Sequence, residues 1–369
     1  MPYKDLHDDP FDPSTIAKLE IFEDYAQAWL PTFVMKGVRT LCIFDFFAGT
    51  GYDKNGIEGS PIRILVKIKE QIGNIFQQKV KVKLYFNEWE PNKREQPKFG
   101  LLQKACDEFL NSNPDVKRAI ELCLLNEDFE TLFPKLLPTI REFPSLVYLD
   151  QNGIKFLSDK YFLELEKTNQ TDFLYFVSAS YFWRFGDKKE FKMHLDIDMV
   201  DAKKDPYRFI HRNIIEQLRK KLPTKTNLKL YPFSLKKGAN IHGIIFGASH
   251  LRAVDKFLSL AWKRNEVNGE ANFDIDEDSK KIQPDLFEGK KMNKIESFKS
   301  LLKSEILNKK LTTNAEVLNF TYNEGHIPKH AADTIKHMKS EKLIKYEGSS
   351  PMVTYENVYK LKNIVHYKI

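Results

Sequence analysis

The stretch from Leu41 to Gly51 constrains the fold of this chain more than any other. An apolar run, Leu41 to Phe44, ends in Asp45, and two glycines, Gly49 and Gly51, follow with one small residue between them. Such a pattern predicts a buried parallel strand that ends in a tight turn, where the missing side chains let a ligand approach the backbone. It therefore predicts a site for a nucleotide-type cofactor at the end of the first strand.

Strand-like and helix-like segments alternate regularly after this turn. Strands are expected over residues 38–46, 80–87, 118–125, 145–150, 172–177, 228–233 and 241–246, and helices over 14–34, 97–111, 129–143, 155–168, 206–221 and 251–263. Alternation of this kind favours parallel βαβ units in one sheet, and the short 234–240 connection makes the last two strands an antiparallel hairpin. The sequence thus predicts a Rossmann-like α/β fold with a seven-stranded sheet.

The positive charge of the chain is concentrated at its C-terminal end. Residues 290–369 hold 15 lysines, 8 acidic residues and no arginine, so their formal net charge is +7. This equals the formal net charge of the whole chain of 369 residues. The sequence has no long apolar span and no basic, apolar leader, so we expect no membrane association and a cytoplasmic location. The three cysteines and the histidines lack the spacing of metal ligands, so no metal site is expected.

The composition also predicts where the domains divide. Residues 265–291 are polar and poor in aliphatic side chains, which is typical of a linker between a domain at 1–264 and one at 292–369. Helices are expected over 295–309, 314–323 and 328–339, and strands over 342–346 and 353–361 as a hairpin around 348–351. Three helices followed by such a hairpin make a winged helix.

Polar residues follow the second and third predicted strands. Glu88 comes directly after the second strand, and Asn126 and Asp128 follow the third. A carboxylate at the first place can accept hydrogen bonds from the two hydroxyls of a ribose, and a polar side chain at the second can bond the exocyclic amine of an adenine. Each of these residues can equally be a solvated loop residue or a helix cap. Together they favour an adenosine pocket.

The spacing around the glycines distinguishes between two adenosine cofactors. A dinucleotide fingerprint needs a third glycine three residues after Gly51, but this chain has Lys54 there. It also needs an acid about 20 residues after the glycines, whereas Glu88 comes later. The segment Asp45-Phe46-Phe47-Ala48-Gly49-Thr50-Gly51 instead resembles motif I of class I methyltransferases that use S-adenosyl-L-methionine (SAM). An NAD-dependent enzyme is the weaker alternative.

The fourth predicted strand ends in Asp150-Gln151-Asn152-Gly153. The matching place in the amino-methyltransferases that modify bases carries Asp/Asn-Pro-Pro-aromatic, which holds the target amine. The resemblance makes Asp150, Gln151 and Asn152 candidate catalytic residues; cofactor binding or loop structure are the alternatives. The aromatic segment 182–185 can stack on a flipped base or form a wall of the domain.

A more specific resemblance joins several of these segments. The motif at residues 45–51, Gly59-Ser60-Pro61, the segment at 149–153, and Gly247-Ala248-Ser249-His250 with the helix after it look like the three-Cys-motif partner proteins. These bacterial proteins look like methyltransferases with a C-terminal winged helix and are encoded beside a radical-SAM-like protein. The resemblance implies SAM as cofactor, held by the motif residues and Ser60. Members commonly have Asp-Pro-x-Gly where this chain has Asp150-Gln151-Asn152-Gly153.

The winged helix offers a basic surface for a polymer. Candidate contacts to nucleic acid are Lys329, His330, Lys336, Lys339, Lys342 and Lys345. Lysine without arginine favours phosphate contact over the reading of bases. Winged helices also dock proteins, which is the alternative. The sequence as a whole predicts a SAM-dependent methyltransferase acting on nucleic acid, or else a methyltransferase-like adaptor that binds DNA or the radical-SAM-like partner.

Overall fold

The computed structural model describes residues 10–90, 97–150, 159–168, 170–178, 210–237, 240–281 and 292–369. Contacts between residues divide the chain into two units, Met1–Ser249 and His250–Ile369. Helix α12 (Leu251–Arg264) therefore groups with the C-terminal unit, whereas the sequence had suggested that it closes the N-terminal domain. None of the described helices has the length and apolarity that a membrane span requires.

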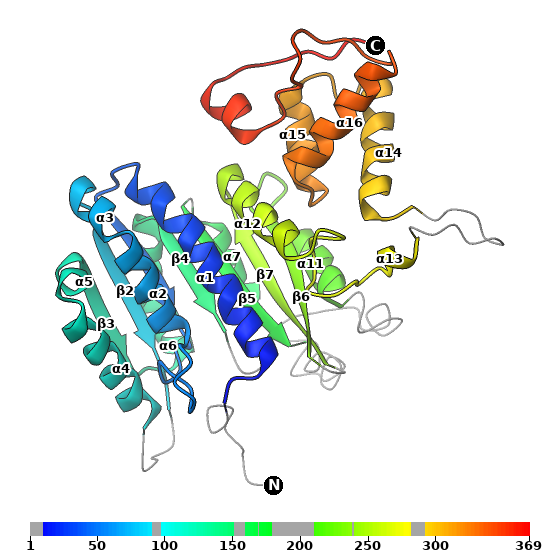
Figure 1. Ribbon diagram of the computed structural model, residues 1–369. Helices are drawn as coiled ribbons and strands as arrows, with labels where there is room; N and C mark the ends of the chain where they lie inside the picture. The colour runs from blue at the N-terminus through cyan, green and yellow to red at the C-terminus, as the bar shows by residue number, and fades with distance from the viewer. Residues whose placement is uncertain are drawn as a thin grey trace. The chain divides into compact units, whose positions relative to one another are not determined.

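The N-terminal unit is built on one seven-stranded sheet with the order β3-β2-β1-β4-β5-β7-β6 (Figure 1). Strands β1 to β5 pair in parallel, and β7 pairs antiparallel with both β5 and β6. This strand order is typical of class I methyltransferases and confirms the predicted fold class. The strands are β1 (Thr40–Asp45), β2 (Lys81–Asn87), β3 (Ile120–Leu125), β4 (Ser145–Leu149), β5 (Thr171–Ser178), β6 (Lys229–Lys237) and β7 (Asn240–Ala248).

The helices of this unit cover both faces of the sheet. They are α1 (Pro13–Val34), α2 (Ser60–Glu70), α3 (Ile72–Gln78), α4 (Lys98–Ser112), α5 (Pro114–Ala119), α6 (Phe129–Glu142), α7 (Asp159–Glu166) and α11 (Ile210–Lys221). Tyr25 of α1 donates a hydrogen bond to Asp172 of β5, whereas Phe162 of α7 packs edge-on against the adjacent Phe173. Because successive strand residues point to opposite faces, α1 and α7 lie on opposite sides of the sheet.

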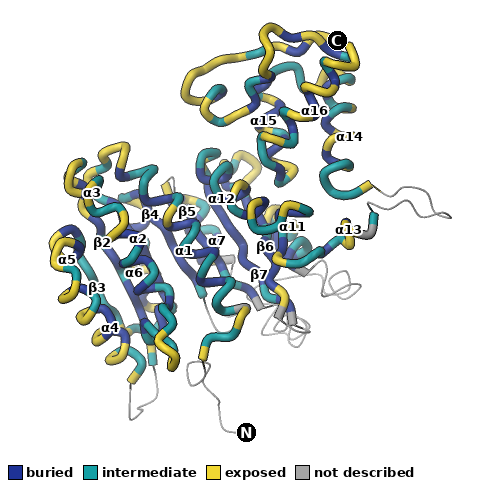
Figure 2. The backbone as a smooth tube through the Cα atoms, in the orientation of Figure 1, coloured by how far each residue is buried: buried dark blue, intermediate teal, exposed yellow. Residues whose placement is uncertain are grey.

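The core of the sheet is apolar and tightly covered. The residues of β1 after Thr40 and all residues of β4 are buried, as is expected of parallel strands with helices on both faces. Figure 2 shows the strands mostly buried and exposed positions on outer helices such as α4 and α5. The hairpin of β6 and β7 is longer than the sequence predicted, because both strands extend into the segment assigned to the connection.

The C-terminal unit contains α12, α13 (Asp278–Lys281), α14 (Lys294–Leu307), α15 (Asn314–Asn323), α16 (Pro328–Ser340) and a π-helical turn at Glu356–Lys360. The three predicted helices are present as α14 to α16. The predicted wing hairpin is wrong: Lys345 bridges to Lys368 near the C-terminus, and the second predicted strand contains the π-helical turn.

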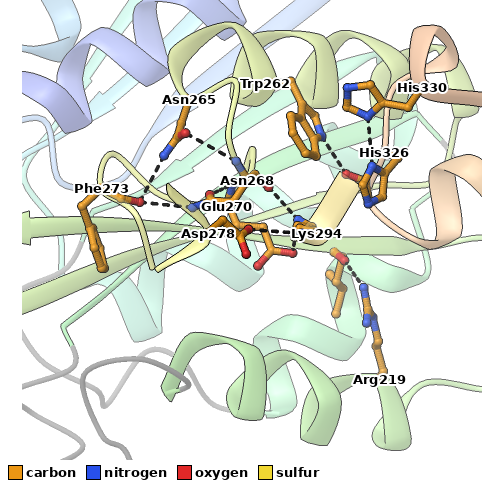
Figure 3. A network of polar contacts seen from close by, with 12 residues as sticks. Arg219, Trp262, Asn265, Asn268, Glu270, Phe273, Asp278, Lys294, His326 and His330 are labelled. Atoms are coloured by element: carbon orange, nitrogen blue, oxygen red, sulfur yellow. Dashed lines mark hydrogen bonds and ion pairs between the residues drawn. The ribbon is translucent and has the colours of Figure 1, made fainter. Parts of the chain in front are cut away.

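Residues 265–281, the first part of the predicted linker, pack within the C-terminal unit. Asn268 and Asp278 are fully buried, and the ammonium of Lys294 donates to the Asn268 carbonyl at 2.7 Å and to Glu270 at 2.6 Å. Figure 3 shows these polar contacts together with the bond from the Trp262 indole to a carbonyl oxygen, that of Gly325. Polar composition here reflects a hydrogen-bonded network. Residues 282–291 lie outside the described ranges.

Candidate functional site

The turn after β1 needs both of its glycines. Gly49 and Gly51 have φ angles of +68° and +86°, in the region that favours glycine. A Cβ on Gly51 would stand 2.6 Å from the Cβ of Ala105 in α4, so the turn also packs too closely for a side chain. The Gly51 carbonyl accepts the Gly59 N–H at 2.8 Å. The backbone is therefore held tightly at the end of the central strand.

Short-range contacts hold the remaining residues of this turn. The Thr50 hydroxyl donates to the Tyr52 carbonyl at 2.6 Å, and the buried Ala48 donates its N–H to the Asn87 carbonyl at 2.9 Å. The half-buried Phe47 ring lies 5.4 Å from the ring of Phe129 in α6. These predicted cofactor residues thus form one ordered turn against the end of β2.

Asp45, the last residue of β1, is a buried carboxylate with few partners. It is 1% exposed and accepts hydrogen bonds from the Ser60 hydroxyl at 2.6 Å and the Phe47 N–H at 3.2 Å. The pKa of Asp45 is raised to about 7, chiefly by burial; the two hydrogen bonds oppose this rise, and the negative charges of Asp150 and Glu88 contribute to it. Asp45 is therefore partly protonated near neutral pH. A cation that binds beside it would favour its ionised form.

Glu88 lies directly against the glycine turn. Its Oε2 accepts the Gly49 N–H at 2.8 Å, and the ammonium of Lys98, the first residue of α4, stands 3.7 Å from Oε1. The residue is 7% exposed. The sequence predicted a shared site for the glycines and the late acid, and the structure brings them into hydrogen-bond contact.

The two predicted residues in the loop after β3, Asn126 and Asp128, have different surroundings. Asn126 is exposed. Asp128 caps α6 and accepts the Glu130 N–H at 3.0 Å, so the helix-cap alternative describes its contacts.

Asn87 is a residue of this region that the sequence reasoning missed. Its side-chain amide donates to the carbonyls of Phe46 at 3.2 Å and Glu127 at 3.0 Å, and its oxygen accepts the Glu127 N–H at 3.0 Å. It is 2% exposed at the last position of β2. An asparagine directly after the run Leu84-Tyr85-Phe86, at the carboxyl end of β2, is the signal that was available.

Asp150 follows β4, the neighbour of β1. The strand order reverses between these two strands, so Asp45 and Asp150 end at the place where ligands bind in open α/β sheets. Asp150 is paired with the ammonium of Lys18 from α1, and that ammonium also lies 4.5 Å from the centre of the Phe176 ring. No sequence pattern pointed to Lys18. Gln151, Asn152 and the aromatic segment 182–185 lie outside the described residues.

The predicted nucleic-acid face divides into exposed and engaged residues. Lys329 and Lys336 of α16 and Lys342 and Lys345 after it are exposed, and within the described ranges none of them forms an ion pair. The Lys339 ammonium instead donates to the carbonyls of Tyr346 at 3.0 Å and Gly348 at 2.7 Å. Lys339 therefore links α16 to the segment after it by hydrogen bonds.

His330 is also engaged within the chain. Its ring lies edge-on against Trp262 at 4.5 Å, and its Nδ1 is 3.0 Å from Nδ1 of His326 (Figure 3). The pKa of His330 is lowered to about 4, chiefly by burial and also by neighbouring lysines, while the charge of Asp333 opposes this shift. The ring is partly buried and neutral at pH 7, so it adds no positive charge to the predicted nucleic-acid face.

Comparisons with known proteins agree with part of this description. A family model described as the GMT-like wHTH domain matches residues 272–351. No curated protein sequence matches the chain. A similar solved structure is the O-methyltransferase TomG from Streptomyces achromogenes, involved in tomaymycin synthesis and crystallised with SAM. It has 11% identity over 64% of this chain and 89% of that chain, with a TM-score of 0.31.

The chain therefore combines a methyltransferase-like sheet with a winged helix-turn-helix region. The strand order establishes the first, and the family model together with α14 to α16 establishes the second.

Proposed function

We propose that this protein is a SAM-dependent methyltransferase that acts on nucleic acid, with the winged helix holding the polymer. The observation that carries the proposal is the contact between Glu88 and the glycine turn beside the buried Asp45, at the reversal point of a methyltransferase-like sheet. The Glu88 carboxylate, the glycine turn and the buried carboxylate of Asp45 are thus adjacent in space.

The chemistry of these residues fits SAM. The cofactor carries a sulfonium and an ammonium cation and a ribose diol. Glu88 can accept hydrogen bonds from the diol. Asp45, whose pKa is raised to about 7 chiefly by burial, gains a partner when a cation enters. We assign Asn126 and the backbone around Asp128, which follow β3, to the adenine edge. The residues present therefore suit the cofactor's charge as well as its ribose.

SAM supplies an electrophilic methyl group when bound, and the chain's own contribution is alignment and charge. Asp150 is the candidate to orient an acceptor amine. It is paired with Lys18 in this structure, so an incoming amine would have to share or displace that pair. Gly49 and Glu88 fix the cofactor side, and Asp150 stands on the neighbouring strand end.

Charge supports nucleic acid as the substrate class. Four exposed lysines lie on and after α16, and residues 290–369 contain no arginine. Lysines act as point charges toward phosphate, whereas base recognition in the major groove relies mainly on bidentate arginine. We therefore infer contact with the phosphate backbone and weak dependence on base sequence.

A second function is favoured by one observation. The pairing of Asp150 with Lys18 occupies the carboxylate that methyl transfer to an amine would use, and Gln151 replaces the usual proline. The chain can therefore serve as an adaptor that binds SAM without transferring its methyl group. The resemblance to three-Cys-motif partner proteins suggests a radical-SAM-like protein as its partner.

A transfer assay separates these functions. Purified protein is incubated with methyl-labelled SAM and duplex DNA, single-stranded DNA or RNA, and label on the polymer is counted. The proposal predicts label on a polymer, lost in Asp45→Asn and Glu88→Gln and kept in Glu121→Gln, a partly exposed carboxylate near the start of β3. SAM binding without label on any polymer would favour the adaptor, and absence of SAM binding would reject both.

A further inference from the structure

Asn87 connects the two segments that flank the proposed adenosine site. Its amide nitrogen donates to a carbonyl of the turn after β1, that of Phe46, and to a carbonyl of the loop after β3, that of Glu127. Its oxygen accepts the Glu127 N–H. Both amide hydrogens are therefore used, and each segment is fixed to the end of β2.

The main chain around Asn87 repeats this arrangement. The Asn87 carbonyl accepts the Ala48 N–H at 2.9 Å, and the Glu88 N–H donates to the Leu125 carbonyl at 3.0 Å. Glu88 itself accepts from Gly49. Residues 87 and 88 together thus set the distance between the glycine turn, the acid and the loop after β3.

We propose that Asn87 is a positioning residue for the adenosine half of the cofactor. The inference rests on the proposed function, because the segments it joins are the ones assigned to ribose and adenine. Asn87 does not contact the ligand in this account. It holds the Glu88 carboxylate and the backbone at Glu127 in one fixed geometry, so that the ribose and the base can be bound at the same time.

The chemistry at this position requires an amide. A carboxylate in its place has no N–H to donate, so it would face two carbonyl oxygens with a negative charge. A protonated carboxyl group regains one O–H donor while still accepting from Glu127. Lowering the pH can therefore restore part of the hydrogen bonding in Asn87→Asp, whereas in Asn87→Ala the hydrogen bonds are lost at every pH.

The test measures the affinity of S-adenosylhomocysteine and of 5′-methylthioadenosine at pH 8 and pH 5.5 for the full chain. Both substitutions should weaken both ligands by about tenfold to a hundredfold at pH 8, since buried backbone groups lose their partners. At pH 5.5 the ratio between Asn87→Asp and wild type should shrink severalfold, and the ratio for Asn87→Ala should stay constant. The matched control is Asn113→Ala. Asn113 lies between α4 and α5, and the substitution removes its side-chain hydrogen bond to the Phe109 carbonyl.

The outcomes separate the inference from its premise. Constant ratios for both variants at both pH values, or unchanged affinity in both, would overturn the role of Asn87. A lowered melting temperature without the pH-dependent recovery would mean that the residue stabilises the fold only, which also overturns it. If the wild-type chain binds neither ligand, it is the proposed function that fails.

Discussion

The affinity for SAM should depend on pH through the carboxylate of Asp45. Burial raises the pKa of Asp45 to about 7, so the residue is largely protonated below neutral pH. A cationic ligand favours the ionised form, because opposite charges attract strongly where water is excluded. SAM should therefore bind more tightly as the pH rises through 7, and binding should release a proton.

The size of this effect follows from the pKa. At pH 6 about one tenth of the Asp45 side chains are ionised, and at pH 8 about nine tenths. If SAM binds only the ionised form, its affinity rises about tenfold over this range, or about 1.4 kcal/mol. Stability changes in the opposite direction: a raised pKa contributes stability that is present below about pH 4 and lost as the pH rises through 7.

Isothermal titration calorimetry at pH 6, 7 and 8, in two buffers with different ionisation enthalpies, measures both affinity and proton release. At pH 7 we expect release of about half a proton for each SAM bound. Asp45→Asn mimics the protonated side chain, so its binding of SAM should be weak or absent at all three pH values. A pH dependence that persists in Asp45→Asn, or a flat wild-type profile without proton release, would refute this reasoning.

Three further predictions concern other parts of the molecule. Gly51→Ala should lower the free energy of unfolding in urea by about 2–4 kcal/mol, through left-handed backbone strain and the contact with α4, whereas Gly56→Ala, whose Cβ would meet nothing within 4 Å, should cost about 1 kcal/mol. Lys329→Gln with Lys336→Gln should weaken binding of all DNA sequences alike and reduce the salt slope of binding by about 2; loss confined to one sequence would contradict phosphate contact. Lys18→Met should lower the free energy of unfolding by about 1–3 kcal/mol, because the Asp150 carboxylate loses its ion-pair partner. The double variant Lys18→Met with Asp150→Asn should recover most of this loss.

The local part of the site was predictable from the sequence, because its signals lie close together along the chain. The run ending in Asp45 and the glycines gave the strand and the turn correctly, and the acid at Glu88 was placed at the right strand end. Apolar runs and turn residues report backbone geometry directly. The alternation of strands and helices predicted the seven strands and the closing antiparallel hairpin, whereas the order of the strands in the sheet came from the structure.

The errors share a physical cause: they depend on partners that are distant in sequence. Lys18 meets Asp150 only because α1 packs on the sheet. The sequence offered His330 as a surface contact, but it could not show that Trp262 of α12 lies against the His330 ring. The wing was predicted from nearby residues, but the bridge from Lys345 reaches Lys368. Composition alone carries no information on such pairings.

The most direct test of the central claim is the binding of S-adenosylhomocysteine to the purified full chain by calorimetry. The account predicts one site for each chain, with binding lost in Asp45→Ala and Glu88→Ala and retained in Glu121→Gln. Absence of binding to the wild type, or equal binding to all the variants, would contradict the claim that the ends of β1 and β2 form a SAM site.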